Sequence, residues 1–176
     1  MVDVNNMDEV MQAISIGFIV ACFLLNTNRV LTSIEICKES LAILKQKAGI
    51  KGNKLAESLC KEVYLIMSNA YRAINDNTNA IKYAHESGEK FEECKLCFNL
   101  AGKYFCQCKY AEARELLKRA LLISTEIGDK NSEACCYLNL GAVYGSVDEY
   151  DKAREHLEKS LAIRKEIGDR NGEASS

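Results

Sequence analysis

A long internal repeat in the second half of the chain limits the folds that this sequence can adopt. When residues 91–130 are aligned with residues 131–170, more than a third of the positions hold the same amino acid. Even the loop phrase Ile-Gly-Asp at 127–129 returns unchanged at 167–169. A fixed period of this length is typical of supersecondary units that stack side by side, because one such unit cannot bury its apolar face alone.

Each copy of the repeat carries its apolar residues at the spacing of an α-helix. In the second copy, Leu140, Tyr144 and Val147 fall on one helical stripe. A further stripe follows, at Tyr150, Ala153, Leu157, Leu161 and Ile163. The polar residues between the two stripes leave room only for a tight turn, so each copy is predicted to be two antiparallel helices.

The repeated loop phrase has a structural explanation. Gly128 and Gly168 are predicted to adopt the left-handed backbone conformation that ends a helix. The Asp or Asn that follows each glycine is suited to cap the next helix with its side-chain oxygen. The phrase therefore recurs because the same turn recurs.

The pattern continues, more weakly, toward the N-terminus. Tyr71 and Ala80 have the same spacing as Tyr104 and Ala113, and Cys37–Gln46 (CKESLAILKQ) resembles the segment LEKSLAIRKE of the last copy. The sequence thus predicts one repeat domain over 8–170, with hairpins at 8–47, 54–88, 91–127 and 131–167. Residues 168–176 are expected to begin a further repeat.

The apolar run Ala13–Leu25 follows the acidic residues Asp3, Asp8 and Glu9. It is shorter than the stretch of about 20 apolar residues that a membrane-spanning helix needs, so a buried helix is favoured over a membrane or signal segment. Lys and Arg (23) and Asp and Glu (25) interleave along the chain, for a net charge of −2. This balance predicts neither a membrane nor a nucleic-acid partner.

The chain has nine cysteines, an odd number with no secretory signal before them. Reduced thiols in the cytoplasm, acting as small buried hydrophobes, are the favoured interpretation. A zinc site is disfavoured because Cys94 and Cys106 are more than three turns apart on one predicted helix, roughly 18 Å at about 1.5 Å per residue. His85 and His156 have no visible catalytic partners, so no enzyme, metal or cofactor is predicted.

The repeated residues resemble those of the tetratricopeptide repeat family. In the last hairpin the matching positions are Tyr137, Leu140, Gly141, Tyr144, Tyr150, Ala153, Leu157 and Ser160. In the hairpin before it they are Leu100, Ala101, Tyr104, Tyr110, Ala113, Leu117 and Ala120. The small residue at 101 and 141 lets two helices approach closely, and the tyrosine three residues later fills the gap beside it.

Two features of the resemblance bear on the subtype. The family's closing proline is absent, since the chain contains no proline. The long repeat period and the Ile-Gly-Asp linker are similar to the long-form repeats of Pins-type G-protein-signalling modulators and of large multi-repeat metazoan scaffold proteins. The G-protein-binding segments of the Pins type have no counterpart here, so that activity is not expected.

The resemblance implies an all-α, right-handed solenoid of four antiparallel helix hairpins, whose first helices line a concave peptide-binding groove. The family's groove positions fall on Asn69, Arg72, Lys95, Phe98, Asn99 and Asn139. The amides are suited to hold a peptide backbone, the two cations an acidic group and Phe98 an apolar side chain. The alternative is that they are solvated residues of a helix face.

Two function hypotheses remain open at this point. The first is a scaffold that binds a partner peptide or helix in the groove; Leu65, Cys135 and Asn139 stand where the carboxylate clamp of chaperone adaptors has other residues, which favours an internal segment as ligand. The second is a structural spacer, or a self-stacking segment of a longer array, in which the uncapped last hairpin associates with another copy.

Overall fold

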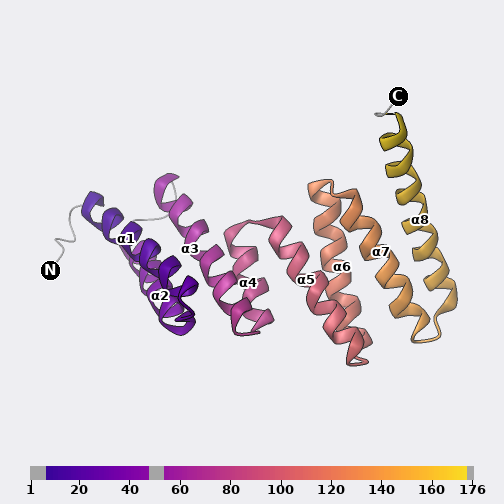
Figure 1. The fold of residues 1–176 in the computed structure, drawn as a ribbon, viewed down its shortest axis with the longest axis horizontal. Coiled ribbons are helices and arrows are strands. Elements are labelled where there is room, and N and C mark those ends of the chain that lie inside the picture. The colour runs from indigo at the N-terminus through magenta and orange to yellow at the C-terminus, as the bar shows by residue number, and fades with distance from the viewer. Residues whose placement is uncertain (1–6, 48–53, 174–176) are drawn as a thin grey trace. The chain divides into compact units, whose positions relative to one another are not determined.

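The computed structural model describes residues 7–47 and 54–173, and within these ranges all regular secondary structure is helical (Figure 1). The described helices are α1 (Met7–Asn26), α2 (Val30–Lys47), α3 (Lys54–Ala73), α4 (Asn77–Ser87), α5 (Lys90–Cys106), α6 (Tyr110–Ile127), α7 (Lys130–Gly145) and α8 (Tyr150–Glu173). They pair as α1–α2, α3–α4, α5–α6 and α7–α8, which confirms the predicted class of all-α helix hairpins.

The chain divides into two compact units, Met1–Glu89 and Lys90–Ser176. In the first unit, α2 packs against α1 and α3, α3 packs against α4, and α1 also contacts α3. In the second unit, α6 packs against both α5 and α7, and α7 packs against α8. Each unit is therefore a stack of two hairpins in which a second helix lies between two first helices.

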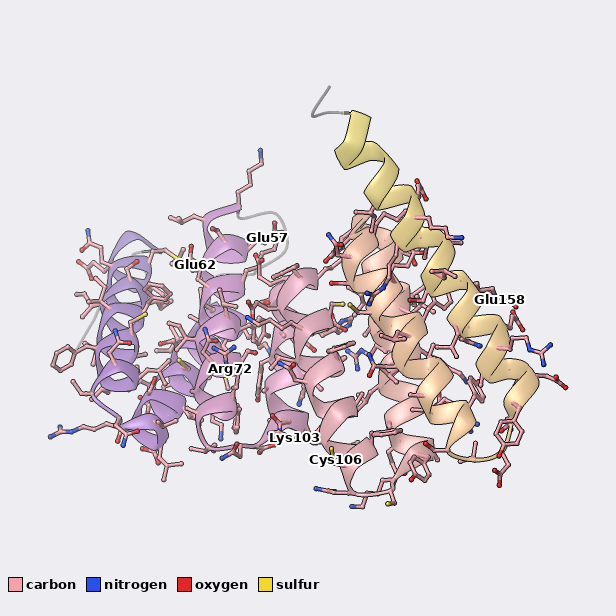
Figure 2. The ribbon with its side chains drawn as sticks, turned by 45° about the vertical axis from the view of Figure 1, so that its right-hand side comes forward. Glu57, Glu62, Arg72, Lys103, Cys106 and Glu158 are labelled. Carbon is pink, nitrogen blue, oxygen red and sulfur yellow. The ribbon has the colours of Figure 1, made fainter. Side chains whose placement is uncertain are left out.

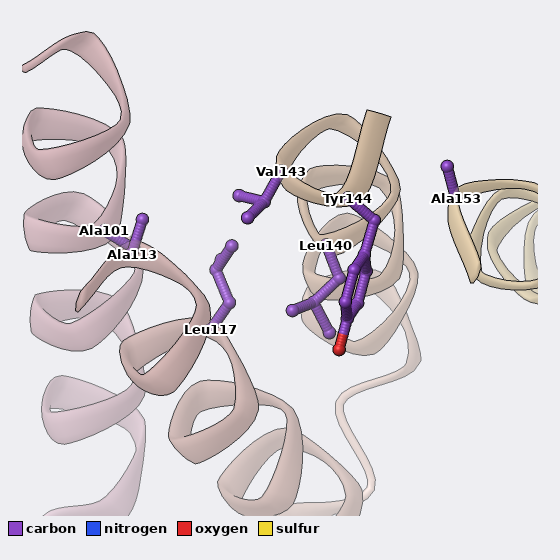
Figure 3. Packing of buried hydrophobic residues seen from close by; sticks show 7 residues of the cluster. All are labelled: Ala101, Ala113, Leu117, Leu140, Val143, Tyr144 and Ala153. Atoms are coloured by element: carbon purple, nitrogen blue, oxygen red, sulfur yellow. The ribbon is translucent and has the colours of Figure 1, made fainter. Parts of the chain in front are cut away.

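The core of the second unit is the seam between its two hairpins (Figure 3). Leu117 of α6 points toward Leu140 and Val143 of α7. All three side chains are buried, with exposed fractions of 3% or less. Burying a leucine side chain contributes about 1.5–3 kcal/mol, so this seam is what holds the two hairpins together.

Gly141 permits the close approach of α7 and α8. A Cβ atom at this position would lie 2.8 Å from Cγ of Leu157 and 3.2 Å from the carbonyl oxygen of Ala153. Two carbon atoms do not approach this closely without displacing one another. The interpretation of Gly141 as a helix-contact residue is thus supported by the geometry.

The left-handed turn predicted at the first Ile-Gly-Asp phrase is confirmed. Gly128 ends α6 with φ at 71°, and its N–H donates to the carbonyl of Thr125. Asp129 then caps α7: its carboxylate accepts from the backbone N–H of Ser132 at 3.1 Å and from the Ser132 hydroxyl at 2.6 Å.

At the second phrase the predicted turn is wrong, because α8 continues through Gly168 to Glu173. Glycine inside a helix costs only about 1 kcal/mol, so it does not end a helix by itself. At Gly128 the turn is supported by α7 packing back onto α6, and the described residues contain no later helix to do the same for α8. Residues 168–176 were expected to begin a further repeat. As far as Glu173 they belong to helix α8, and residues 174–176 lie outside the described residues.

All four hairpins make the turn between their own two helices in the same way, without glycine. The residue in the left-handed region is Asn28, Asn75, Cys108 or Asp148, each with φ between 59° and 62°. The next backbone N–H donates to a carbonyl five residues back, as in the bond from Lys109 to Tyr104 at 2.9 Å. This hydrogen bond is typical of a Schellman helix end. Cys108 is thus a turn residue.

Helix α1 differs from the buried helix predicted for the apolar run Ala13–Leu25. Ile14 and Ala21 are buried against the neighbouring helices, but Ile16, Ile19 and Phe23 are each more than 60% exposed. Among the described helices, α1 alone is long and apolar enough to cross a membrane, over Glu9–Asn26, and 28% of that window is buried. The prediction was wrong because an apolar run predicts a helix but not how many of its faces find a neighbour.

Candidate interaction pocket in the second unit

A pocket of about 230 Å³ lies between α5 and α7, the first helices of the two hairpins in the second unit. It exists because α6 packs against both helices from one side and leaves their opposite edges apart. Its walls are Phe91, Cys94, Lys95 and Phe98 of α5 and Asn131, Ser132 and Cys135 of α7. We call this site the α5–α7 pocket.

Two aromatic side chains supply most of the apolar wall. Phe91 and Phe98 are two helical turns apart, which places both rings on the same face of α5. Phe91 is 57% exposed and Phe98 is half-buried. An exposed phenylalanine beside a cavity of this size is suited to receive one or two apolar side chains of a ligand.

The rim of the α5–α7 pocket is polar. Lys95 extends its ammonium group to 3.4 Å from the Glu92 carboxylate, and the Lys95 side chain is 49% exposed. Across the pocket, the Ser132 hydroxyl donates to Asp129, while Asn131 is exposed. The rim thus offers one cation and one amide to a ligand.

The cysteines of this region are packing residues. The Cys94 thiol donates to the carbonyl of Ala120 at 3.4 Å, and burial, followed by the charges of Asp129 and Glu93, raises its pKa. Burial also raises the pKa of Cys97 and Cys136 to about 12. These thiols stay protonated at neutral pH and are poor nucleophiles and metal ligands.

The remaining cysteines fit the same description in part. Cys37, with a pKa raised to about 12 by burial, and Cys60 are also buried. Cys108 is exposed in the turn after α5, and Cys106 is exposed at the end of α5 (Figure 2). Cys94 and Cys106 both lie in α5, so the predicted helix that separates them and disfavours one shared zinc ion is present. Within the described ranges, no three His, Cys, Asp or Glu side chains are grouped as metal ligands would be.

Glu93, next to the pocket residue Cys94 on α5, is a buried carboxylate. The Glu93 carboxylate, 5% exposed, accepts from Nη2 of Arg119 at 2.6 Å and from Nε of the same residue at 2.8 Å. Both nitrogens reach the same oxygen, Oε1, and this charge-assisted contact joins α5 to α6 and restricts both side chains. It therefore holds the neighbouring pocket residues in place.

Of the six residues predicted to line a groove, Lys95 and Phe98 line the α5–α7 pocket. Asn99 is exposed on α5. Asn139 lies on α7, and its side-chain N–H₂ donates to the backbone carbonyl of Cys135 at 2.8 Å, so part of its hydrogen-bonding capacity is used within its own helix.

The other two predicted residues, Asn69 and Arg72, belong to the first unit. They lie one turn apart on α3, and Nη2 of Arg72 donates to Oδ1 of Asn69 at 2.9 Å. Arg72 is labelled in Figure 2. A ligand would have to compete with this exposed hydrogen bond. The assignment of all six residues to a binding groove stays a prediction.

The predicted binding residues did not include Phe91, Cys94, Asn131 or Ser132. Phe91, Asn131 and Ser132 precede the first position of the family motif, so a register carried over from the motif does not reach them. The signal that the sequence offered is the two-turn spacing of Phe91 and Phe98 within the predicted hairpin 91–127.

The geometry defines a helical-repeat protein with a small pocket between adjacent first helices. Residues 91–166, which hold α5, α6, α7 and most of α8, match the tetratricopeptide repeat family. No curated protein matches the chain. This match covers less than half of the chain, so the similarity to the tetratricopeptide repeat family is shown for these residues, and a fold of this kind points in general to a protein partner.

Solved structures similar to the chain include the apo form of RapI, at 18% identity and a TM-score of 0.54, with 89% of this chain and 57% of that one covered. Aspartyl phosphate phosphatase F from Bacillus subtilis matches at 15% identity and a TM-score of 0.52, covering 90% and 42%. BtubC from P. vanneervenii matches at 20% identity and a TM-score of 0.50, covering 88% and 64%. The chain spans less than two thirds of the length of each, and at these identities the likeness concerns the fold.

Proposed function

We propose that the chain is a protein-interaction scaffold that holds a segment of a partner polypeptide against α5 and α7. The observation that carries this proposal is the α5–α7 pocket, an apolar hollow beside an exposed phenylalanine with a cation and an amide at its rim. An apolar side chain of the partner would enter between Phe91 and Phe98. Lys95 would attract an acidic neighbour in the same segment.

Pre-organisation makes such a small site useful. The pocket residues stand on two helices that are held by the buried seam around Leu117 and by the Glu93–Arg119 pair. A partner therefore orders only itself on binding, which lowers the entropic cost of association. Asn99 and Asn139 supply exposed or half-exposed amides for the partner's backbone, and Asn69 and Arg72 would serve in the same way on the first unit.

Several finer assignments belong to this proposal. The chain acts as an adaptor in the cytoplasm, performs no catalysis, uses no cofactor or metal, and engages a peptide or helix rather than nucleic acid or a membrane. Its repeats are of the long form similar to those of Pins-type modulators and multi-repeat metazoan scaffolds. The buried, protonated thiols and the interleaved charges are consistent with these assignments.

The test starts from peptides selected against the full chain from a displayed random library. We expect Phe91→Ala and Phe98→Ala each to weaken the selected peptide by about tenfold or more, since aromatic anchors dominate such interfaces. The double change Asn99→Ala with Asn139→Ala is expected to weaken it while leaving helicity and the thermal midpoint nearly unchanged.

The matched control is Leu122→Ala, which removes a side chain that is 65% exposed on α6, away from the pocket. It should leave the dissociation constant within about twofold, since exposed substitutions outside the contact contribute little. Selected peptides that bind the Phe91 and Phe98 variants as tightly as the unaltered chain would refute the pocket assignment.

A second function is favoured by one observation on α8. Leu157 and Leu161 are 43% and 54% exposed and lie one turn apart. An apolar face of this kind fits the alternative of a spacer or self-stacking segment of a longer array. Light scattering tests it: a concentration-dependent mass that Leu157→Glu abolishes would support self-stacking, and a monomer at high concentration would reject it.

A further inference from the structure

The two units repeat one cluster of aromatic rings. In the first unit the Tyr83 ring of α4 lies 6.1 Å from that of Tyr64 and 5.3 Å from that of Tyr71, both on α3. In the second unit the His156 ring of α8 lies 5.9 Å from Tyr137 and 5.0 Å from Tyr144, both on α7. Each ring of the second cluster follows its counterpart at one constant offset along the chain, so the two clusters occupy the same place in their hairpins.

The lysines around the two clusters are paired differently. In the second unit Lys159 and Lys152 lie over tyrosine rings, and each is bonded to a glutamate: Lys159 to Glu155 at 2.5 Å, and Lys152 to Glu149. In the first unit, Lys45 lies 5.9 Å from the Tyr64 ring centre and Lys82 lies 5.4 Å from that of Tyr83.

Lys38 completes a set of three cations around the first cluster, since it lines the same hollow as Lys45, Lys82 and Tyr83. None of the salt bridges described for the chain involves Lys38, Lys45 or Lys82. At the offset that relates the two clusters, Lys82 and Glu86 take the places of Glu155 and Lys159, but the salt bridges described for the chain include none between them.

These lysines surround a cleft of about 410 Å³ between α2, α3 and α4, which we call the lysine cleft. Its floor is apolar, formed by the buried side chains of Leu41 and Met67 with the half-buried rings of Tyr64 and Tyr83. Of the nine residues that line it, three are lysines and one, Glu86, is acidic. The cleft therefore carries a net charge of +2 in a chain whose overall charge is −2.

We propose that the lysine cleft binds an acidic segment of a polypeptide, placing its carboxylate or phosphate groups among Lys38, Lys45 and Lys82 and its aliphatic carbons against the edges of the Tyr64 and Tyr83 rings. Three mobile ammonium groups over a hydrophobic floor suit two or more anionic side chains in succession. The site lies between α2, α3 and α4 of the first unit, so it shares no residue with the α5–α7 pocket and does not depend on it.

Two observations favour a peptide over nucleic acid. The lining of the cleft holds three cations and the acidic Glu86, a short basic set rather than the extended basic face that binding to a phosphate backbone requires. The tyrosine rings stack on one another, and lysines lie over the Tyr64 and Tyr83 rings, so open faces for base stacking are not presented. A side-chain hydrogen bond to Tyr64 and then the charge of Tyr64 raise the pKa of Lys45 most, and the charge of Glu86 adds to this, so the ammonium group stays charged.

The experiment measures fluorescence anisotropy of labelled hexaglutamate with the full chain. We expect saturable binding at about 20 mM salt that weakens strongly at about 500 mM, because the contacts are exposed ion pairs. The variant Lys38→Gln/Lys45→Gln/Lys82→Gln should weaken the complex by about tenfold or more. Circular dichroism checks that it folds, which the exposure of all three lysines leads us to expect.

The matched control changes three lysines that are ion-paired in the second unit: Lys118→Gln/Lys152→Gln/Lys159→Gln. It alters the net charge equally and should leave the affinity within about threefold, as expected of a non-specific charge effect. An equal loss in both triple variants would overturn the proposal, and so would the absence of binding at low salt.

Two further probes identify the anion. A hexapeptide of alternating phosphoserine and glycine separates phosphate from carboxylate. Tighter binding than that of hexaglutamate assigns a phosphorylated segment, and weaker binding assigns a Glu- or Asp-rich segment. Either result supports the cleft if the Lys38→Gln/Lys45→Gln/Lys82→Gln variant abolishes the binding. Single-stranded oligothymidine that binds more tightly than either peptide, with the same loss in that variant, would overturn the assignment to a polypeptide.

Discussion

The two hairpins of the second unit share more than a third of their aligned sequence, yet equivalent residues differ in how deeply they are buried. Leu117 and Leu157 hold equivalent positions on α6 and α8. Leu117 is 3% exposed because α7 covers it, whereas Leu157 is 43% exposed. The comparison teaches that the repeat motif specifies which residues are able to pack, while the presence of a neighbouring hairpin decides which of them do.

The same contrast holds for a buried carboxylate. Glu93 and Glu133 are equivalent, and both are less than 10% exposed. Glu93 pairs with Arg119 across α5 and α6, but Glu133 pairs at 2.8 Å with Lys130 in its own helix. The counterpart of Arg119 is Lys159, whose ammonium group turns to Glu155 instead. Two nitrogens of the arginine guanidinium donate to Oε1 of the buried carboxylate, which the single ammonium group of a lysine does not reproduce.

The largest difference is expected for the leucine pair. Leu117→Ala should lower the free energy of unfolding by about 3 kcal/mol, since it empties space in the seam between hairpins. Leu157→Ala should lower it by about 1 kcal/mol or less, because the side chain is partly hydrated already. Urea unfolding followed by circular dichroism measures both. Equal losses would indicate that another surface covers Leu157 in solution.

The ion pair is expected to give the next difference. Arg119→Ala leaves the Glu93 carboxylate without its guanidinium partner and should cost about 1–2 kcal/mol, less than a fully buried pair because Arg119 is 41% exposed. Lys159→Ala should cost less than about 0.5 kcal/mol, as an exposed pair does. Thermal unfolding compares them, with Arg119→Lys as an intermediate. A Lys159 variant as unstable as the Arg119 variant would contradict the assignment.

The two glycines of the Ile-Gly-Asp phrases should respond with opposite signs. Gly128→Ala forces a Cβ into the left-handed region and should cost about 1–2 kcal/mol. Gly168→Ala replaces a glycine within α8 and should stabilise that helix by about 0.5–1 kcal/mol. Helix content and melting of the two variants report the effect. Destabilisation by Gly168→Ala would show that the second phrase also forms a turn.

The smallest effect concerns the cap at Asp129. Its hydrogen bonds from the Ser132 side chain and then the backbone N–H groups lower the pKa of the Asp129 carboxyl in the folded state. The stabilisation is therefore complete above the unfolded pKa of about 3.9 and is lost as the pH falls through the lower folded value. Asp129→Ala should cost about 0.5–1 kcal/mol at pH 7 and progressively less below about pH 4. A pH-independent difference would refute the cap.

Much of the fold could be predicted from the sequence because its signals are local. The stripes at Tyr144 and Leu157 define helices, and the turn at Gly128 separates two of them. The left-handed residues at Cys108 and Asp148 were not predicted, since the turn between paired helices is set by backbone hydrogen bonding and accepts residues of different chemistry.

The candidate site was predicted only in part. The family register located Lys95 and Phe98, because groove positions follow from helical geometry. It did not locate Phe91, which precedes the motif, and it did not reveal that Asn139 bonds to the carbonyl of Cys135. Rotamers and cavities depend on atoms from several helices at once, so a pattern along one helix does not specify them.

The sequence by itself determined that this protein is a series of helix pairs, since helical spacing, small residues at 101 and 141 and the glycine at 128 act within one or two turns of the chain. Which faces of those helices are covered required the packed structure. The exposure of Ile16 on α1 and of Leu157 on α8, the continuation of α8 through Gly168, and the gathering of three lysines around the Tyr64 and Tyr83 rings all depend on which helices lie beside which. Burial is a property of neighbours, and neighbours are assembled from segments that are distant along the chain.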